Sequence, residues 1–408
     1  MTFLRREFLL ALAGSSALTA KPHAEIALAG GKVYPSPSAQ PFQKGVVVLR
    51  DGRVSAVGPV TKTRIPPKAL VVDCRTRVVL AGFANSHVHF SEPHWTPAAT
   101  LPAASLSAYF QNMLTRWGYT SVFDTGSDSQ NTLALIRRIE AGEIPGPAIR
   151  RAGGGFVKKD GTPSYLKDTR RLPELLTAEQ ATIAVREVLE QGADAIKIFA
   201  GSAGVAGPAL SLEIIRAVTA EAHRQQKLVF SHPQHREGVM NSVLGGVDIL
   251  AHTAPRSGVW DQDLVRQMVE RHMSLIPTLH LFEVEFRRLG RPPEEQRTLV
   301  QAAKDQLTAF AQAGGDVLFG TDVGYMTDYD PTREYQLMAE AGLTPAQILA
   351  SLTTNPATRF ADSRSRGQLA PGFLGDVVVL KGDPFDDVRN FAQVQLCMRQ
   401  GKVLFRSN

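Results

Sequence analysis

Histidine, lysine and aspartate residues that could bind a metal recur along this chain of 408 residues. The closest pair is His87 and His89, which follow an apolar run that starts at Leu80. Side chains at positions i and i+2 of a strand point to the same face, so the two imidazole rings should converge. Neutral imidazole is the commonest metal-binding side chain near neutral pH. A His-x-His pair alone is close to a chance match, so its meaning depends on the elements that position it.

An alternation of short apolar runs and helical patterns surrounds these residues. We predict eight strands, at 78–84, 121–124, 148–152, 193–199, 227–231, 247–251, 274–278 and 317–320. We predict helices at 177–191, 212–225, 261–271 and 294–313. Over residues 80–364 this pattern matches an α/β fold, a closed (β/α)8 TIM-type barrel. A doubly wound open sheet is the alternative, but it usually carries a Gly-rich nucleotide turn after its first strand.

Short β-rich runs lie near both ends of the chain. Residues 26–79 contain apolar runs broken by turns, and Asp51-Gly52 between two such runs predicts a hairpin. Residues 375–380 and 394–405 repeat this character. Neither half has enough strands to bury a sheet face alone. We therefore predict a small β-sandwich domain formed jointly by residues 25–79 and 365–408.

Residues 1–24 have the pattern of an export signal. Arg5 and Arg6 precede a short apolar run, which resembles a twin-arginine signal, a route used by proteins that cross the membrane already folded. The apolar run is too short for a stable membrane span. We therefore expect a periplasmic protein without a stable membrane anchor after the signal is removed.

Composition narrows the possible partners. The formal net charge is +6, but Lys and Arg are scattered and form no basic block, so we expect no nucleic-acid partner. A small-molecule substrate is expected instead, and the chain could form a homo-oligomer. The two cysteines, Cys74 and Cys397, are too few for a Cys-rich zinc site or a disulfide framework. Sequence leaves open whether they pair after export.

The candidate metal ligands lie at the carboxyl ends of predicted strands. They are His87 and His89 after the first strand, Lys197 within the fourth, His232 after the fifth, His252 after the sixth and Asp322 after the eighth. A barrel of this type carries its active site at the carboxyl ends of its strands. Their joint placement is far more specific than any single residue, and it predicts a metal-dependent active site.

With these residues in place, the chain resembles the amidohydrolase superfamily over residues 26–405. The resemblance rests on Phe83-Ala-Asn-Ser-His-Val-His89, Ala193-Asp-Ala-Ile-Lys-Ile-Phe199, Ile249-Leu-Ala-His252 and Phe319-Gly-Thr-Asp322. The string around Lys197 and residues 371–376 are most similar to the branch of imidazolonepropionases and Xaa-Pro dipeptidases. The resemblance implies two divalent metal ions, zinc first and manganese or iron as alternatives, bridged by a carboxylated Lys197.

Each assigned role has a structural alternative. Burial would lower the pKa of Lys197 and supply the neutral amine that carbon dioxide needs to form a carbamate, although a lysine can also extend its amine out of a core. Asp322 could bind metal and transfer a proton as the catalytic residue, or simply cap a helix. His232 is favoured over His235 as a ligand because it directly ends its strand. His235 and His280 are candidate substrate contacts.

The predicted function is hydrolysis of an amide C–N bond by a metal-bridging hydroxide. One metal would bind His87, His89 and Asp322, and the other His232 and His252. Dipeptides, Xaa-Pro dipeptides and N-acyl amino acids are the expected substrates. Hydrolysis of a cyclic amide, carbamate or lactone is the alternative, as is a mononuclear deaminase.

The deaminase alternative is weakened because such enzymes usually carry a glutamate where this chain has His235. A non-catalytic scaffold is less expected, because such chains tend to lose ligands and this one keeps all six. Four basic residues beside a Gly-rich loop could hold a substrate carboxylate or simply be solvated. They are Arg150, Arg151, Lys158 and Lys159.

Overall fold

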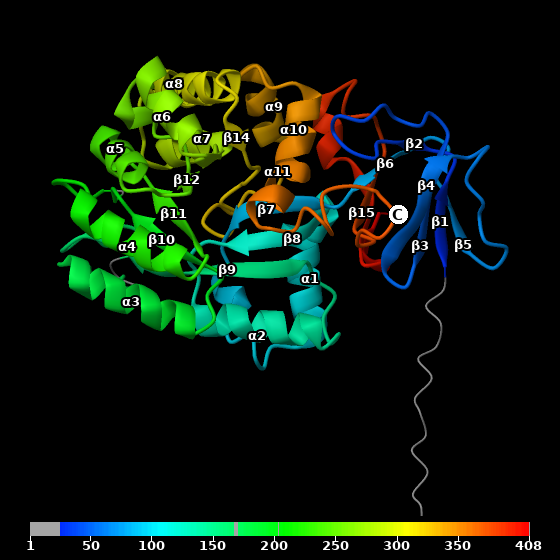
Figure 1. The fold of residues 1–408 in the computed structure, drawn as a ribbon, viewed down its shortest axis with the longest axis horizontal. Helices are drawn as coiled ribbons and strands as arrows, with labels where there is room; N and C mark the ends of the chain where they lie inside the picture. Colours follow the sequence, from blue (N-terminus) through cyan, green and yellow to red (C-terminus); the bar gives the residue numbers. More distant parts are fainter. Residues whose placement is uncertain (1–24, 167–169, 203, 408) are drawn as a thin grey trace, which may run out of the picture.

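A computed structural model describes residues 25–166, 170–202 and 204–407 (Figure 1). The export signal predicted at residues 1–24 lies outside the described residues and stays a prediction. Helices surround a curled sheet in the larger part of the molecule, whereas strands from the two ends of the chain, blue and red, lie side by side in the smaller part (Figure 1).

An eight-stranded parallel sheet forms the centre of the larger part, and its strand order follows the chain. The strands are β7 (Phe83–Val88), β8 (Tyr119–Asp124), β9 (Ala148–Phe156), β10 (Ala195–Phe199), β11 (Leu228–His232), β12 (Ile249–Ala251), β13 (Ser274–Ile276) and β14 (Asp316–Val317). After β14 the chain returns to β7, where the Ser86 amide donates to Phe319 O at 2.8 Å and the Asp322 amide donates to His87 O at 2.9 Å. These bonds bring the first and last strands together, which confirms the predicted barrel.

The helices lie around the sheet (Figure 1). They are α1 (Ala103–Met113), α2 (Ser129–Glu140), α3 (Ala178–Glu190), α4 (Leu212–Arg224), α5 (Arg236–Leu244), α6 (Gln262–Glu270), α7 (Leu279–Arg288), α8 (Pro293–Gln312), α9 (Thr332–Glu340), α10 (Pro345–Leu352) and α11 (Thr354–Arg359). Short 3-10 helices are η1 (Pro93–Trp95), η2 (Thr115–Trp117), η3 (Pro255–Ser257) and η4 (Val388–Ala392).

The four predicted helices correspond to α3, α4, α6 and α8, and each end agrees to within one residue. Local capping explains this agreement. The side chains of Thr177, Ser211 and Asp261 each accept a hydrogen bond from an amide in the first turn of α3, α4 and α6. Such caps satisfy amides that have no partner within the helix, and they fix where the helix begins.

The barrel interior is filled by apolar side chains beneath the carboxyl ends of the strands. Phe123, Phe230, Ile249 and Ile276 belong to one buried cluster. Phe360, just after α11, packs against it with its ring centroid 4.9 Å from that of Phe123. Because strand side chains alternate in direction, Phe230 in the core and His232 at the strand end share one face of β11.

The small β domain consists of two sheets. Their strand orders are β4-β3-β1-β5 and β17-β16-β15-β6-β2. The strands are β1 (Ile26–Ala29), β2 (Lys32–Val33), β3 (Gly45–Arg50), β4 (Arg53–Pro59), β5 (Leu70–Asp73), β6 (Val78–Ala81), β15 (Val377–Leu380), β16 (Val394–Arg399) and β17 (Lys402–Arg406). Side chains of both sheets, such as Leu28, Val47 and Val379, share one buried cluster. The predicted sandwich built from both ends of the chain is therefore confirmed. The predicted hairpin connects β3 and β4, with positive φ at Asp51 (50°) and Gly52 (74°).

The strand predicted at 78–84 is in fact two strands. Val78–Ala81 form β6, which pairs antiparallel with β15 in the small domain, whereas the first barrel strand starts at Phe83. Gly82 connects them, and a Cβ at this position would lie 2.3 Å from Thr120 Oγ1. Hydrophobicity alone could not show this division, because both strands are apolar and buried.

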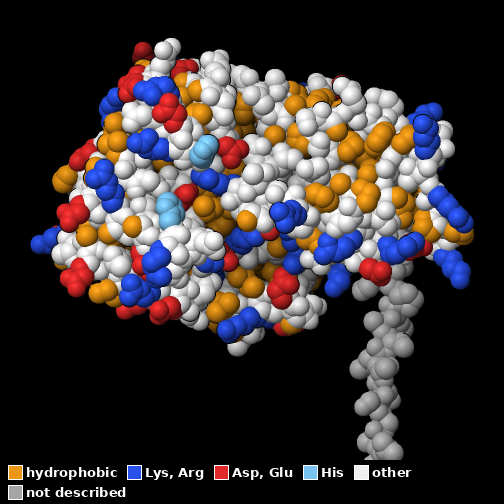
Figure 2. All heavy atoms as spheres, in the orientation of Figure 1, with side chains coloured by type: hydrophobic (Ala, Val, Ile, Leu, Met, Phe, Trp, Pro, Cys, Tyr) orange, Lys and Arg blue, Asp and Glu red, His pale blue; other side chains and the backbone are white. Residues whose placement is uncertain are grey.

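Cys74 and Cys397 are both buried free thiols. Among the described residues, we find no helix that combines the length and the apolar character needed to cross a bilayer. On the face drawn in Figure 2, acidic and basic side chains are interspersed over the barrel.

Candidate metal centre

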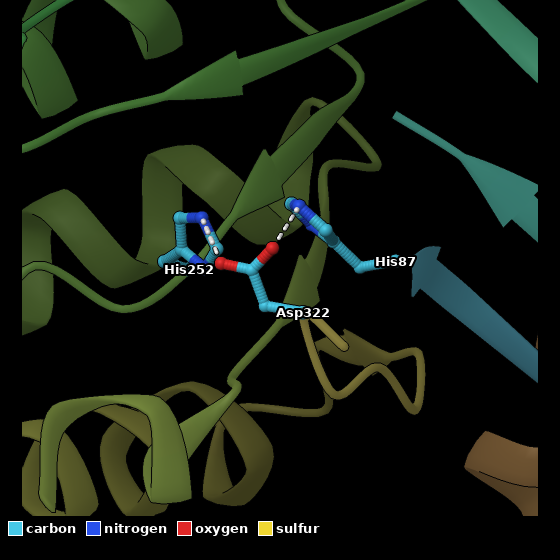
Figure 3. Close-up of side chains that lie close together, drawn as sticks. All are labelled: His87, His252 and Asp322. Atoms are coloured by element: carbon cyan, nitrogen blue, oxygen red, sulfur yellow. Dashed lines mark ion pairs between the residues drawn. The ribbon is translucent and has the colours of Figure 1, made fainter. Parts of the chain in front are cut away.

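Asp322 lies among three of the predicted histidine ligands. Its Oδ1 is 3.3 Å from His87 Nε2 and 2.9 Å from His89 Nε2, and its Oδ2 is 3.8 Å from His252 Nε2. Figure 3 shows the Asp322 carboxylate between His87 and His252. Each of the residues His87, His252 and Asp322 offers one potential ligand atom, and these three atoms lie within 4.8 Å of one another. The structure thus brings together side chains from β7, from the end of β12 and from the segment after β14.

His232 and Lys197 lie beside this group. The His232 ring centroid is 4.9 Å from that of His252, whose own centroid is 4.7 Å from that of His87. Lys197 is only 2% exposed on β10, and its Nζ lies 5.5 Å from the centre of the Phe199 ring. Strands β7, β10, β11 and β12 and the segment after β14 therefore place the four histidines, Lys197 and Asp322 in one region at the carboxyl end of the barrel.

Burial sets the protonation states of this region. It lowers the pKa of His87 to about 3 and that of His232 to about 4, and it also lowers the pKa of His252. Burial would raise the pKa of Asp322, but the electrostatic influence of His87 and His89, whose rings lie beside the carboxylate, outweighs it and holds this pKa well below its ordinary value. At neutral pH the buried imidazoles of His87, His232 and His252 are therefore neutral, and the Asp322 carboxylate is ionised.

Lys197 differs from an ordinary lysine. Burial lowers the pKa of its amine to about 8, although the charge of Asp322 acts in the opposite direction. Roughly a tenth of the amine is then neutral at pH 7, against less than a thousandth for a solvated lysine. Burial therefore increases the share of neutral amine, which is the form that carbamate formation requires.

This donor set fits a divalent cation. Asp322 Oδ1 and His87 Nδ1 are buried and have no hydrogen-bond partner among the described residues. A buried carboxylate surrounded by neutral imidazoles is costly unless a positive charge compensates it. Nitrogen and oxygen donors of this kind are preferred by zinc and by similar transition metals.

Several residues around the centre adopt backbone conformations that are rare for side chains other than glycine. The φ angles are 117° at His252, 60° at Asp322, 44° at Thr278 and 57° at Gln234. Such conformations persist only where the surrounding structure enforces them, and they concentrate at functional sites. Two of the candidate ligands are therefore held in strained positions.

Thr278 determines the orientation of His252. Its hydroxyl donates to Pro277 O at 2.9 Å, so it must accept the hydrogen bond from His252 Nδ1 at 2.7 Å. This arrangement assigns the proton of His252 to Nδ1 and leaves the lone pair of Nε2 directed towards Asp322. Partners of this kind fix both the tautomer and the direction of a metal-binding histidine.

Glu334 in turn positions Thr278. This residue of α9 is 2% exposed, and its carboxylate accepts hydrogen bonds from the amides of Leu279 at 2.9 Å and His280 at 2.7 Å. These two amides begin α7 directly after Thr278, so Glu334 anchors the start of that helix. Burial raises the pKa of Glu334 to about 7, although the two amides act in the opposite direction.

Asn85 links the two chain segments that carry His87 and Asp322. Its Nδ2 donates to Thr321 Oγ1 at 2.7 Å, and its Oδ1 accepts from the His87 amide at 3.2 Å. Sequence reasoning missed Asn85, Thr278 and Glu334. The position of Asn85, two residues before His87, was the one available signal, because strand periodicity places both on one face.

The two predicted substrate contacts have partners within the protein. His235 caps α5, and its Nδ1 accepts from the Gly238 amide at 3.3 Å. His280 Nδ1 is 3.1 Å from Glu283 Oε2, and its Nε2 is 3.5 Å from Asp328 Oδ2. A role for either histidine in substrate binding stays a prediction.

The basic residues near the Gly-rich loop separate into two groups. Arg150 and Arg151 lie on β9, where Arg150 pairs with Asp362 at 2.8 Å and Arg151 Nη2 donates to Gln191 O at 2.6 Å. Lys158 follows β9, and its Nζ donates to Ala206 O at 3.1 Å. Lys158 is therefore nearer the carboxyl end of the barrel than either arginine.

Comparison with known proteins defines the class to which this barrel belongs. Residues 78–404 match the profile of the Amidohydrolase family. The chain therefore belongs to this family, and the protein is a hydrolase of the amidohydrolase superfamily.

Individual relatives agree with this assignment. Ochratoxinase from Aspergillus niger is 25% identical over 407 aligned positions, which cover 87% of this chain and 81% of the relative. The crystal structure of a putative prolidase from Bifidobacterium longum superposes with a TM-score of 0.80 and 26% identity, covering 95% of this chain and 96% of the other. A Xaa-Pro dipeptidase with bound methionine also gives 0.80, with 21% identity and coverage of 94% and 100%, and it supports the fold. The branch indicated by the sequence is confirmed.

Proposed function

We propose that this protein hydrolyses an amide C–N bond in a dipeptide, an Xaa-Pro dipeptide or an N-acyl amino acid, with the help of bound metal ions. The observation that carries the proposal is the buried Asp322 carboxylate, which lies between His87 and His252 and lacks a hydrogen-bond donor at Oδ1. Similarity to a putative prolidase and to a Xaa-Pro dipeptidase supports an amide substrate.

The proposed ligands divide into two sets. His87, His89 and Asp322 would hold one divalent ion, His232 and His252 would hold the other, and carboxylated Lys197 would join them. When bound, such ions supply a hydroxide at neutral pH and polarise the substrate carbonyl. Zinc is the first candidate, because imidazole and carboxylate donors suit it, and manganese or iron are the alternatives.

Carboxylation of Lys197 follows from its neutral amine. The amine nitrogen attacks the carbon of carbon dioxide, an N–C bond forms and one N–H proton leaves to solvent, which yields a carbamate anion. The pKa of about 8 supports this step, because the neutral form is the nucleophile. The carbamate would replace a poorly solvated ammonium by an anion with two oxygen donors.

Asp322 is the proposed general base and acid. Its depressed pKa keeps it ionised, and Oδ1 has no hydrogen-bond donor among the described residues, so it can accept the proton of the attacking water. The same carboxylic acid can then protonate the departing nitrogen. A buried carboxylate is suited to this transfer because little solvent competes for the proton.

Variants at Lys197 test the proposal. We expect the wild-type protein to bind two zinc ions and to hydrolyse Xaa-Pro dipeptides or N-acyl amino acids. Lys197→Ala should lose at least about 100-fold in kcat and bind less metal, because it removes the bridging ligand. Short carboxylic acids should partly restore its activity. Lys402→Ala, at an exposed position on β17, is the matched control.

Two outcomes would contradict the proposal. Turnover of lactones alone, with no hydrolysis of any dipeptide or N-acyl amino acid, would remove the amide substrate class. Full occupancy by two metals together with unchanged turnover in Lys197→Ala would remove the bridging role of the lysine.

A further inference from the structure

A cavity of about 250 Å³ lies at the end of the barrel opposite the candidate metal centre. Its walls come from β7, β8 and β9 on one side and from α11 and the segment that follows it on the other, with Asp376 of the small domain completing the lining. Figure 1 shows β7, α11 and β15 close together where the two domains meet. This volume equals that of about eight water molecules, which is enough for one small organic molecule. None of the six candidate metal ligands lines it.

Two arginines and two aspartates line this cavity and balance each other in formal charge. Arg150 forms a two-bond pair with Asp362, with distances of 2.8 and 2.9 Å. Arg366 hydrogen-bonds Asp376, and its Nε lies 3.8 Å from Asp362. A ligand with one net charge would leave a charge without compensation in this partly enclosed site. A zwitterion brings one group of each sign and preserves the balance.

Some donors in the lining have no partner. Arg150 Nε and Arg366 Nη2 form no hydrogen bond within the described parts of the chain, because these arginines use other nitrogens in their pairs. A carboxylate placed beside the two guanidinium groups would accept hydrogen bonds from both.

The rest of the wall is apolar. Ile149, Phe123, Pro356 and Phe360 line the cavity beside the charged groups. The Arg150 guanidinium lies 5.9 Å from the centre of the Phe360 ring, so the charged and apolar parts of the lining adjoin. This combination suits a molecule with a carboxylate, an ammonium group and a small apolar side chain.

We propose that this cavity binds a free α-amino acid with an apolar side chain. Its carboxylate would contact Arg150 and Arg366, and its ammonium group would face Asp362 and Asp376. The apolar side chain would lie against Phe123 and Phe360. The site is distinct from the metal centre, and its ligand is inferred from the cavity alone, so it does not depend on the proposed reaction.

Calorimetric titration of the metal-loaded protein with L-valine tests this inference, with isovalerate and isobutylamine as ligands that carry one charge each. We expect saturable one-to-one binding of valine and at least tenfold weaker binding of the other two. Binding of all three with equal affinity would overturn the zwitterion site, as would the absence of saturable binding by valine, leucine, proline and methionine.

Variants locate the bound amino acid. Ala148→Leu places a larger side chain in the cavity lining and should weaken valine binding at least tenfold, whereas Ala313→Leu, at the exposed end of α8, should not. Chelation of the metals should leave binding intact. Loss of binding on chelation, with full retention in Ala148→Leu, would place the amino acid at the metal centre and overturn the proposal.

Discussion

At the scale of single residues, the metal centre depends on groups that do not belong to it. His252 has a φ of 117°, and its ring direction is fixed by a hydrogen bond to Thr278 Oγ1. Thr278 itself has a φ of 44° and is followed by the two amides that Glu334 holds. A ligand in a strained conformation therefore relies on a chain of contacts that runs through β13, α7 and α9.

Replacing Thr278 with Val tests this dependence, because valine has the same shape and no acceptor. The His252 Nδ1 proton would lose its partner, and the ring could adopt the other tautomer or rotate. We expect metal affinity and kcat to fall by about 10- to 100-fold. Metal titration and steady-state kinetics measure the effect.

Thr182→Val is the matched control, because Thr182 Oγ1 bonds only within α3, to Ala178 O. If Thr278→Val bound metal as tightly as the wild type and as tightly as this control, Thr278 would have no positioning role.

Residue-level prediction from the sequence used position along a strand. The structure places His87, Lys197, His232 and His252 in a strand or directly at its end, as that reasoning expected. Thr278 and Glu334 could not be found in this way, because their roles arise from contacts between distant parts of the chain. In sequence Glu334 looks like an ordinary charged residue of a surface helix, and only the fold shows that it is buried.

At the scale of elements, α7 and α9 are joined by an ion-pair cluster beside the site. Glu283 of α7 lies 2.7 Å from Arg333 Nη2 of α9 and 3.1 Å from His280 Nδ1. Burial acts to raise the pKa of Glu283, but the hydrogen bonds from His280 and Arg333 outweigh it and lower the pKa to about 2. This cluster helps to hold the helix that begins at Leu279.

The depressed pKa of Glu283 predicts a dependence of stability on pH. A carboxyl whose pKa is lower in the folded state stabilises the fold above its unfolded pKa of 4.5, and this contribution is lost as the pH falls towards 2. After allowance for solvent screening at Arg333, we expect about 1–2 kcal/mol. Urea unfolding of the wild type and of Glu283→Gln should therefore differ at pH 7 and converge near pH 2. A constant difference across this range would contradict the assignment.

Element prediction was accurate where local sequence determines an element. The caps of α3, α4 and α6 gave the helix starts, and the Asp51-Gly52 turn gave the hairpin. It was wrong at residues 78–84, which contribute to both domains. The tertiary partners of β6 and β7 decide that boundary, and those partners lie far away in the sequence.

At the scale of the whole molecule, the candidate centre connects the first and last parts of the barrel. His87 and His89 belong to the beginning of the barrel, and Asp322 follows its final strand. A metal bound to these residues would therefore join the two edges of the sheet. Opening the barrel at this place would require the metal to dissociate.

Removal of metal should therefore lower stability. At a free metal concentration 1,000 times the Kd, binding to the native state alone contributes about 4 kcal/mol. We expect chelation to lower the Tm of the wild type by several degrees, and zinc to restore it. Differential scanning calorimetry measures both shifts. Asp322→Asn should show smaller shifts than the wild type, because it removes a ligand of one of the two ions, and equal shifts in that variant would contradict the assignment of Asp322 as a ligand.

The pairing of β6 with β15 also bears on how the protein is made. A ribosome releases Val78–Ala81 early and Val377–Leu380 only after the entire barrel has been synthesised. Until then, the edge of the apolar strand β6 that pairs with β15 has no partner. Exposed strand edges promote aggregation in nascent chains. The barrel must therefore be completed while its neighbouring domain is half assembled. A chain that stops before residue 377 would keep this edge unpaired, so we expect it to aggregate although the missing strands contribute no residue to the metal centre.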